Sequence, residues 1–204
     1  MRIKFTSKEI VLLALLSTAW AAIEINFGIL LQTLQIPFKG AFLTFLALII
    51  LFIGRDLVPK RWAVFFMGLT TAFMKFIFLG GMAISPVIAI LMEVTLVELC
   101  LLQKQPRKLN YYMAGAAGLV WSFLHPFFIQ GLLVGWGILK VYKIIIEKGA
   151  ALFGLEQQFF GIFLLLLVSH IILGAIAGAI GYKFSQFVIR RYNNIAVYQR
   201  YTEC

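Results

Sequence analysis

The sequence predicts an all-α integral membrane protein in which six transmembrane helices form one bundle and both termini lie in the cytoplasm. Three observations lead to this fold class. Of the 204 residues, 62% are hydrophobic and 13% are charged, whereas a soluble domain has about 25% charged residues. The apolar residues form long runs without the alternation of barrel strands, and helices satisfy their own backbone hydrogen bonds in lipid. Basic residues cluster between these runs.

Six apolar runs approach the length of about 20 residues that crosses a bilayer. They cover residues 9 to 31, 38 to 54, 62 to 79, 84 to 102, 110 to 135 and 159 to 189. Gly80 and Gly81 form the turn between the third and fourth runs, and the last run is long enough to tilt or to extend into the cytoplasm. No composition break divides the chain, so residues 1 to 204 are expected to form a single transmembrane domain.

The basic residues predict the orientation. With the N-terminus inside, thirteen lie on the cytoplasmic side and four lie outside, namely Lys39, Lys140, Lys143 and Lys148. Cytoplasmic loops are enriched in Lys and Arg, so the net charge of +10 indicates contact with membrane lipid and not with nucleic acid. Lys140, Lys143 and Lys148, with Glu147, follow a roughly helical period, which indicates an amphipathic segment at the interface or an extension of the fifth helix.

Polar residues of several spans fall at one depth when a rise of about 1.5 Å per residue is applied. The ionisable members are Glu24, Lys75, Glu93, His125 and His170, and near them lie Asn26, Trp121 and Gln130. Charges at membrane depth are costly and usually face a protein interior or a wet cavity. A mostly apolar pocket with a few polar groups is typical of a small-molecule site, so these eight residues are the candidate substrate-binding set. Glu98 is expected nearer the cytoplasm.

These residues also have structural interpretations. Lys75 and Glu93 are expected at the centre of the layer, where an ion pair between them would tie the third span to the fourth. His125 precedes a proline and would satisfy a carbonyl that the proline frees, and His170 would pack between helices. Glu24 has no basic partner in its own helix, which makes a purely structural interpretation hardest for this residue.

Small residues recur at every fourth position in three spans and allow helices to approach closely. They are Ala14, Thr18 and Ala22 in the first span, Ala114 and Gly118 in the fifth, and Gly174 and Gly178 in the sixth. In the fifth and sixth spans they are expected inside the bundle. The stripe of the first span would either do the same or form an outward docking face for another membrane subunit.

The chain combines four features: six spans in 204 residues, the stripe on the first span, IPFKG at the second span, and PKRWAVFFMGLTTAFMKFIFLGG leading to SPVIAILMEVTLVEL. In this combination it resembles the S components of energy-coupling factor transporters, a class of ABC transporter. The resemblance implies a high-affinity substrate-binding subunit for uptake of a vitamin or related micronutrient across a prokaryotic plasma membrane. It also implies docking, through Ala14, Thr18 and Ala22, on a transmembrane coupling protein with two ATPase subunits. Residues 32 to 40 would form the loop that closes the outer site.

The resemblance further implies roles for the layer. Glu24 and Glu93 would accept hydrogen bonds from the ligand, Lys75 would fix these carboxylates or an anionic group of the ligand, and Trp121 would stack on it. The chain is not expected to be an enzyme, because it lacks the Gly-Lys-Ser signature of a phosphate-binding loop. ATP hydrolysis would belong to the partner subunits.

No metal or cofactor is expected. Cys100 and Cys204 lack the spacing of metal ligands, and the sole aspartate, Asp56, is placed in a loop. The main alternative function is a self-sufficient carrier coupled to protons through Glu24 or Glu93, and a membrane enzyme is a second. Carriers usually have paired broken helices. The candidate positions for such breaks are Pro86, in the apolar run 84 to 102, and Pro126, in the run 110 to 135.

Overall fold

The computed structural model describes residues 4–36, 38–80, 84–103, 105–135, 137, 140, 143 and 159–202. These residues form six α-helices and no strand, as predicted. The helices are α1 (Ser7–Thr33), α2 (Lys39–Leu57), α3 (Ala63–Leu79), α4 (Ile84–Cys100), α5 (Lys108–Val134) and α7 (Phe159–Thr202). Each lies within a few residues of its predicted span except α7, which continues beyond residue 189. Most of the predicted amphipathic segment, including Glu147 and Lys148, lies outside the described residues.

Four of these helices are long and apolar enough to cross a membrane: α1, α2, the Lys108–Ile129 part of α5 and the Phe160–Tyr192 part of α7. Helices α3 and α4 are apolar but have 17 residues each. At 1.5 Å per residue they rise about 25 Å, somewhat less than the hydrocarbon core of about 30 Å. The described part of the chain is therefore a helical membrane protein with at least four helices of spanning character.

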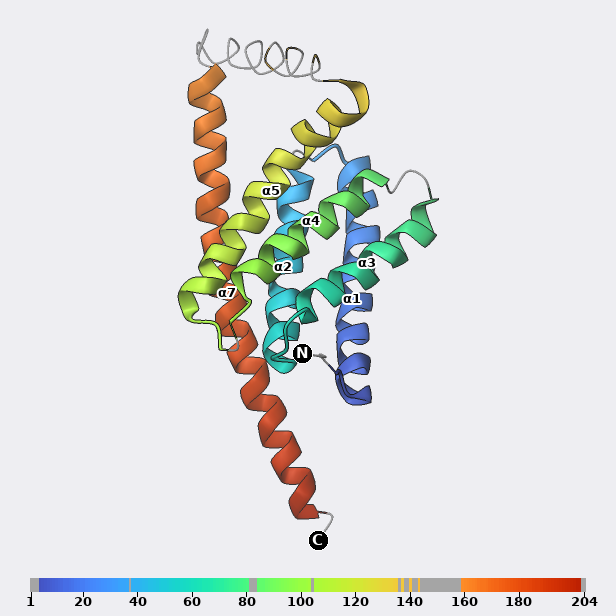
Figure 1. The fold of residues 1–204 in the computed structure, drawn as a ribbon, viewed down its shortest axis with the longest axis vertical. Coiled ribbons are helices and arrows are strands. Elements are labelled where there is room, and N and C mark those ends of the chain that lie inside the picture. Colours follow the sequence, from blue (N-terminus) through green and yellow to red (C-terminus); the bar gives the residue numbers. More distant parts are fainter. Residues whose placement is uncertain are drawn as a thin grey trace.

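Helix α2 occupies the centre of the bundle, because it contacts α1, α3, α5 and α7. Its residues Leu48, Leu51 and Phe52 are completely buried. Helix α7 runs along one side of the bundle and extends past the other helices toward the C-terminus (Figure 1). Gly80 ends α3 with a φ of 58°, a conformation that glycine adopts without strain, whereas Gly81 lies outside the described residues.

Helices α5 and α7 cross through glycines, which confirms the prediction for these spans. A Cβ atom on Gly174 would overlap the carbonyl oxygen of Gly115, and one on Gly178 would overlap that of Tyr111. The adjacent Ala114 and Ala177 are completely buried. The two backbones therefore touch, which is the close packing that small residues permit in membranes.

Asp56 lies in the last turn of α2 and not in a loop, so its predicted placement was wrong. The helix continues three residues past the predicted end, because its polar last turn finds partners on two other helices. The Asp56 carboxylate accepts hydrogen bonds from the hydroxyl of Tyr111 on α5 and from Ser185 Oγ (2.5 Å) and Gln186 Nε2 (3.2 Å) on α7. Asp56 therefore joins three helices at one end of the bundle.

Glu98 of α4 caps the N-terminus of α3. The helix begins after Trp62, which has a φ of 70° and makes no capping bond with its own side chain. The buried carboxylate of Glu98 instead accepts the backbone N–H groups of Trp62 (2.7 Å), Val64 (3.1 Å) and Phe65 (3.3 Å). An anion at a helix N-terminus satisfies free donors and interacts favourably with the helix dipole, so Glu98 has a structural role.

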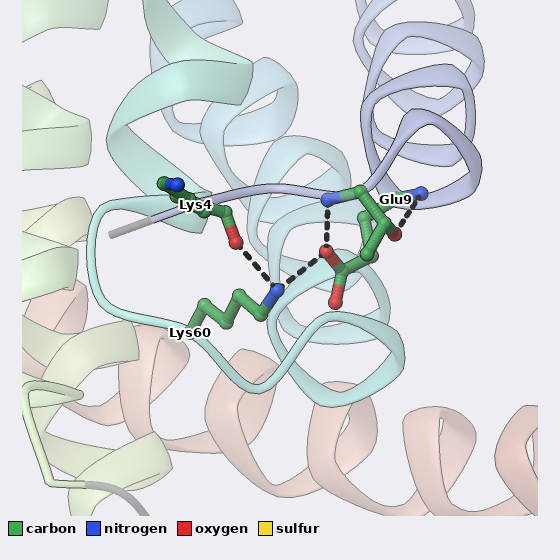
Figure 2. A network of polar contacts seen from close by, with 4 residues as sticks. Lys4, Glu9 and Lys60 are labelled. Carbon is green, nitrogen blue, oxygen red and sulfur yellow. Dashed lines mark hydrogen bonds and ion pairs between the residues drawn. The ribbon is translucent and has the colours of Figure 1, made fainter. Parts of the chain in front are cut away.

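The beginning of α1 is tied to the connection between α2 and α3. Thr6 and Glu9 form a capping box, and Lys60 Nζ contacts both Glu9 Oε2 (2.6 Å) and the carbonyl of Lys4 (2.8 Å), as Figure 2 shows. The side chains of Lys60 and Glu9 are 32% and 23% exposed. This is a surface ion pair, in contrast to the buried charges of the bundle.

Candidate binding cavity

A cavity of about 530 Å³ lies inside the bundle and is lined by residues of all six described helices. Its volume falls in the range of about 300–1,000 Å³ that is usual for ligand pockets. Six of the eight predicted site residues line it, and they are Glu24, Lys75, Glu93, Trp121, His125 and His170. The common depth in the sequence thus corresponds to a common cavity in the structure.

Lys75 pairs with Glu24 and not with Glu93. Its Nζ atom lies 2.5 Å from Glu24 Oε2, and the two residues are 7% and 6% exposed. The structural alternative in which Lys75 pairs with Glu93 is therefore not found, because α1 packs directly on α3 and turns Glu24 toward Lys75. The basic partner that Glu24 lacks in its own helix is supplied from a different one.

Glu93 is left with half of its carboxylate unpaired. Its Oε2 atom accepts a hydrogen bond from Thr44 Oγ1 on α2 at 3.0 Å, whereas its Oε1 atom is buried and has no hydrogen-bond partner among the described residues. The side chain lines the cavity and the residue is only 4% exposed. Burial of a polar group without a partner costs free energy, so this oxygen is a point where a bound molecule would be stabilising.

Thr44 also lines the cavity, although it was not among the predicted site residues. Most threonine hydroxyls in these helices donate to the carbonyl four residues earlier, as those of Thr70 and Thr95 do. Thr44 donates across the bundle to Glu93 instead. A threonine in an otherwise apolar run is the only signal in the sequence, and it does not distinguish these two arrangements.

The aromatic residues of α5 form another wall of the cavity. Trp121 Nε1 donates to the carbonyl of Ala89 (3.0 Å), and His125 Nε2 bonds to the carbonyl of Ser85 (3.1 Å). The rings of Trp121 and His125 are 5.7 Å apart. The acceptor of His125 therefore lies on α4 and is not a carbonyl freed by Pro126 in its own helix.

His170 closes the cavity from α7. Its Nδ1 atom bonds to the carbonyl of Leu166 at 2.7 Å, within the same helix. Its ring packs on Phe123, with centroids 4.9 Å apart, and meets Phe38 edge-on at 5.9 Å. Packing between helices, which was the structural interpretation of His170, is therefore present together with its position on the cavity wall.

The remaining two predicted site residues are Asn26 and Gln130. Asn26 lies on the exposed side of α1, where its side-chain amide donates to the carbonyl of Ala22 (2.8 Å). Gln130 belongs to α5, but its side chain lies outside the described part of the structure. Asn26 lies only two residues after Glu24, but its position around the helix axis turns it outward.

A second cavity of about 490 Å³ adjoins the first and shares the ion pair as part of its wall. Both cavities are lined by Glu24, Lys39, Leu43, Lys75 and Pro86. Of the predicted closing loop of residues 32 to 40, Phe38, Lys39 and Gly40 line the first cavity. The left-handed φ of 58° at Phe38 sets the direction in which this loop enters α2.

Among the described residues, no group of three or more His, Cys, Asp or Glu side chains is placed to hold a metal ion. No model of a known protein family, no curated protein and no solved structure matches this chain. The chemistry of the cavity is therefore the guide to function.

Proposed function

We propose that this chain is the membrane-embedded substrate-binding subunit of an energy-coupling factor transporter, which takes up a vitamin-like micronutrient. The observation that supports the proposal most directly is the single cavity lined by six residues of the predicted polar layer. Glu24, Lys75 and Glu93 are buried there at a cost in free energy. Ionisable residues inside a membrane usually mark a substrate or ion site.

The proposal places all six described helices across the membrane with both termini in the cytoplasm. Figure 1 shows the two ends of the chain on the same side of the bundle, as an even number of crossings requires. Helices α3 and α4 have only 17 residues each. In the proposal they still cross the membrane, because polar groups at their cytoplasmic ends, such as the Glu98 carboxylate, are hydrogen-bonded to neighbouring helices. The cavity would then open toward the outer face, where residues 32 to 40 would close over the ligand.

The energy would come from partners. In the proposal, the exposed stripe of α1 docks on a transmembrane coupling protein that carries two ATPases. Thr18 and Ala22 are exposed and Ala14 is half-buried, which supports the outward of the two alternatives for this stripe. The Thr18 hydroxyl donates to the Ala14 carbonyl at 2.9 Å, so the stripe offers a partner helix a smooth face without a free donor at Thr18.

Native mass spectrometry tests the binding function. The protein is purified in mild detergent from cells grown in rich medium, and the spectrum is searched for a co-purifying small molecule. We expect a vitamin-sized ligand on the wild type that is lost in Glu93→Ala and retained in Glu9→Ala, since Glu9 lies in the surface ion pair. Absence of a ligand from the wild type, with both variants as stable as their parent, would contradict the proposal.

A proton-coupled carrier is the second candidate, and the unpaired Oε1 atom of Glu93 favours it, because a proton could bind there. The paired helix breaks expected of such a carrier do not occur at the two candidate prolines, since Pro86 and Pro126 lie inside continuous helices. Proteoliposomes that contain only this chain distinguish the two functions. Accumulation of the ligand driven by a proton gradient would establish the carrier, and the binding subunit would show none.

A further inference from the structure

Three hydrogen-bond donors of the cavity wall are used within the protein. Thr44 donates to Glu93, and Trp121 donates to the carbonyl of Ala89. Lys75 donates to Glu24, and its charge is balanced by that carboxylate. The buried positive charge of the cavity wall is therefore already balanced among the described residues, and the donors that remain on the wall belong to Lys39, Ser85 and Ser122.

Hydrogen-bond acceptors, in contrast, remain open. Glu93 Oε1 has no partner in the described part of the chain. His125 and His170 each bond to a backbone carbonyl, through Nε2 and Nδ1 respectively. Because a carbonyl only accepts, these nitrogens carry the hydrogens, and the second nitrogen of each neutral ring is an acceptor. Three acceptors from three helices thus line one cavity.

The charge distribution leads to the same ligand class. The buried ionisable groups on the wall are Glu24, Lys75 and Glu93, and with Glu93 ionised they together carry one net negative charge. Lys39 also lines the cavity, but it bonds to Gln32 at an exposed position, where water screens its charge. A positive charge on the ligand would compensate the unbalanced carboxylate.

We propose that the ligand of this cavity is a planar organic cation with several N–H donors, such as an amidine or a protonated amino-heteroaromatic ring, and that its charged group binds Glu93. Trp121 lines the same cavity and attracts a cation over its ring face. The terminal torsion of a glutamate has two broad, nearly equivalent orientations, so either carboxylate oxygen can reach the ligand. This inference rests on the proposed function and adds the chemical class of the substrate.

Matched pairs of small probes test it. Benzamidine is compared with benzoate, and 4-aminopyridine with isonicotinate, by calorimetric titration of the protein in nanodiscs of uncharged lipid. We expect each cation to bind at least about tenfold more tightly than its matched anion, because charge-assisted hydrogen bonds to a buried carboxylate are strong. Equal affinities, tighter binding of the anions or binding of neither member of a pair would overturn the inference.

Variants identify the group responsible. Glu93→Gln keeps the size of the side chain and should remove the preference for cations, whereas Glu9→Gln at the surface ion pair should retain it. A preference that persists in folded Glu93→Gln would overturn the assignment to Glu93. Where that variant does not fold, the cation preference of the wild type decides.

The two proposals can fail separately. An anionic or neutral ligand in the native mass spectrum would overturn the cation inference and leave the uptake function standing. A cavity that prefers cations in a chain that co-purifies with no ligand would retain the inference and contradict the uptake function.

Discussion

Lys75 on α3 and Glu24 on α1 form a buried ion pair in which Nζ and Oε2 are 2.5 Å apart. The pair lies in the wall between two cavities and contributes to both. Removing two charges from water costs several kcal/mol per ion, and their attraction repays this only when the geometry is good. Each residue therefore depends on the other to compensate its buried charge, and the pair fixes α1 against α3 beside the site.

We predict that replacing one member of this pair destabilises the protein more than replacing both. Lys75→Met or Glu24→Gln alone should lower the free energy of unfolding by about 3–5 kcal/mol, because each leaves an unpaired buried polar or charged group. The double variant Glu24→Gln/Lys75→Met should recover most of that loss. Unfolding in a titration with SDS, followed by tryptophan fluorescence, gives the three values. A double variant that loses the sum of the single losses would show that the residues are not coupled.

Glu98 provides the second prediction. Glu98→Ala should lower the free energy of unfolding by about 1–3 kcal/mol, since the N–H groups of Val64 and Phe65 lose their buried acceptor. Glu9→Ala is the matched control, because a partly exposed ion pair contributes about 0–1 kcal/mol. The same SDS titration measures both variants. Equal losses would mean that the carboxylate of Glu98 is not a cap on α3.

The meeting of the polar residues in one cavity could be predicted from the sequence, and the pairing between them could not. A fixed rise per residue places Glu24, Lys75, Glu93, His125 and His170 at one level without knowledge of the packing. Pairing depends on how each helix is rotated about its axis. That rotation is set by side-chain packing along whole helices, and in nearly uniformly apolar segments the hydrophobic pattern does not specify it.

The same limit explains the other differences. Asn26 follows Glu24 by two residues but lies on the exposed side of α1, whereas Thr44 was overlooked and bonds to Glu93. Asp56 was placed in a loop because polar residues follow the second apolar run, but its partners on α5 and α7 keep it helical. Glycine spacing was more informative, since Gly174 and Gly178 lie inside the bundle as expected, where they contact α5.

The crossing of α5 and α7 gives the third prediction. Gly174→Ala should prevent the close approach of the helices, because its Cβ would meet the carbonyl of Gly115 and the backbone of Ala116. Backbone atoms cannot move aside as a flexible side chain can, so we expect a loss of about 1–3 kcal/mol in stability or failure to fold. Gly161→Ala is the control, because its Cβ would have no neighbour within 4 Å. Size-exclusion profiles and thermal unfolding midpoints compare them, and similar midpoints would contradict the tight crossing.

The α1 stripe gives the last prediction. Thr18 is exposed on this helix and does not line the cavity, so Thr18→Leu should leave ligand binding intact. A bulky side chain on a small-residue face would hold a partner helix away. We therefore expect Thr18→Leu to abolish co-purification of a transmembrane subunit and two ATPases, identified by peptide sequencing and by their phosphate-binding loops. Gly161→Leu, at an exposed and open position on α7, should retain them. If Thr18→Leu still binds both ATPases at the wild-type ratio, this face of α1 meets lipid alone and the partner contacts the chain elsewhere.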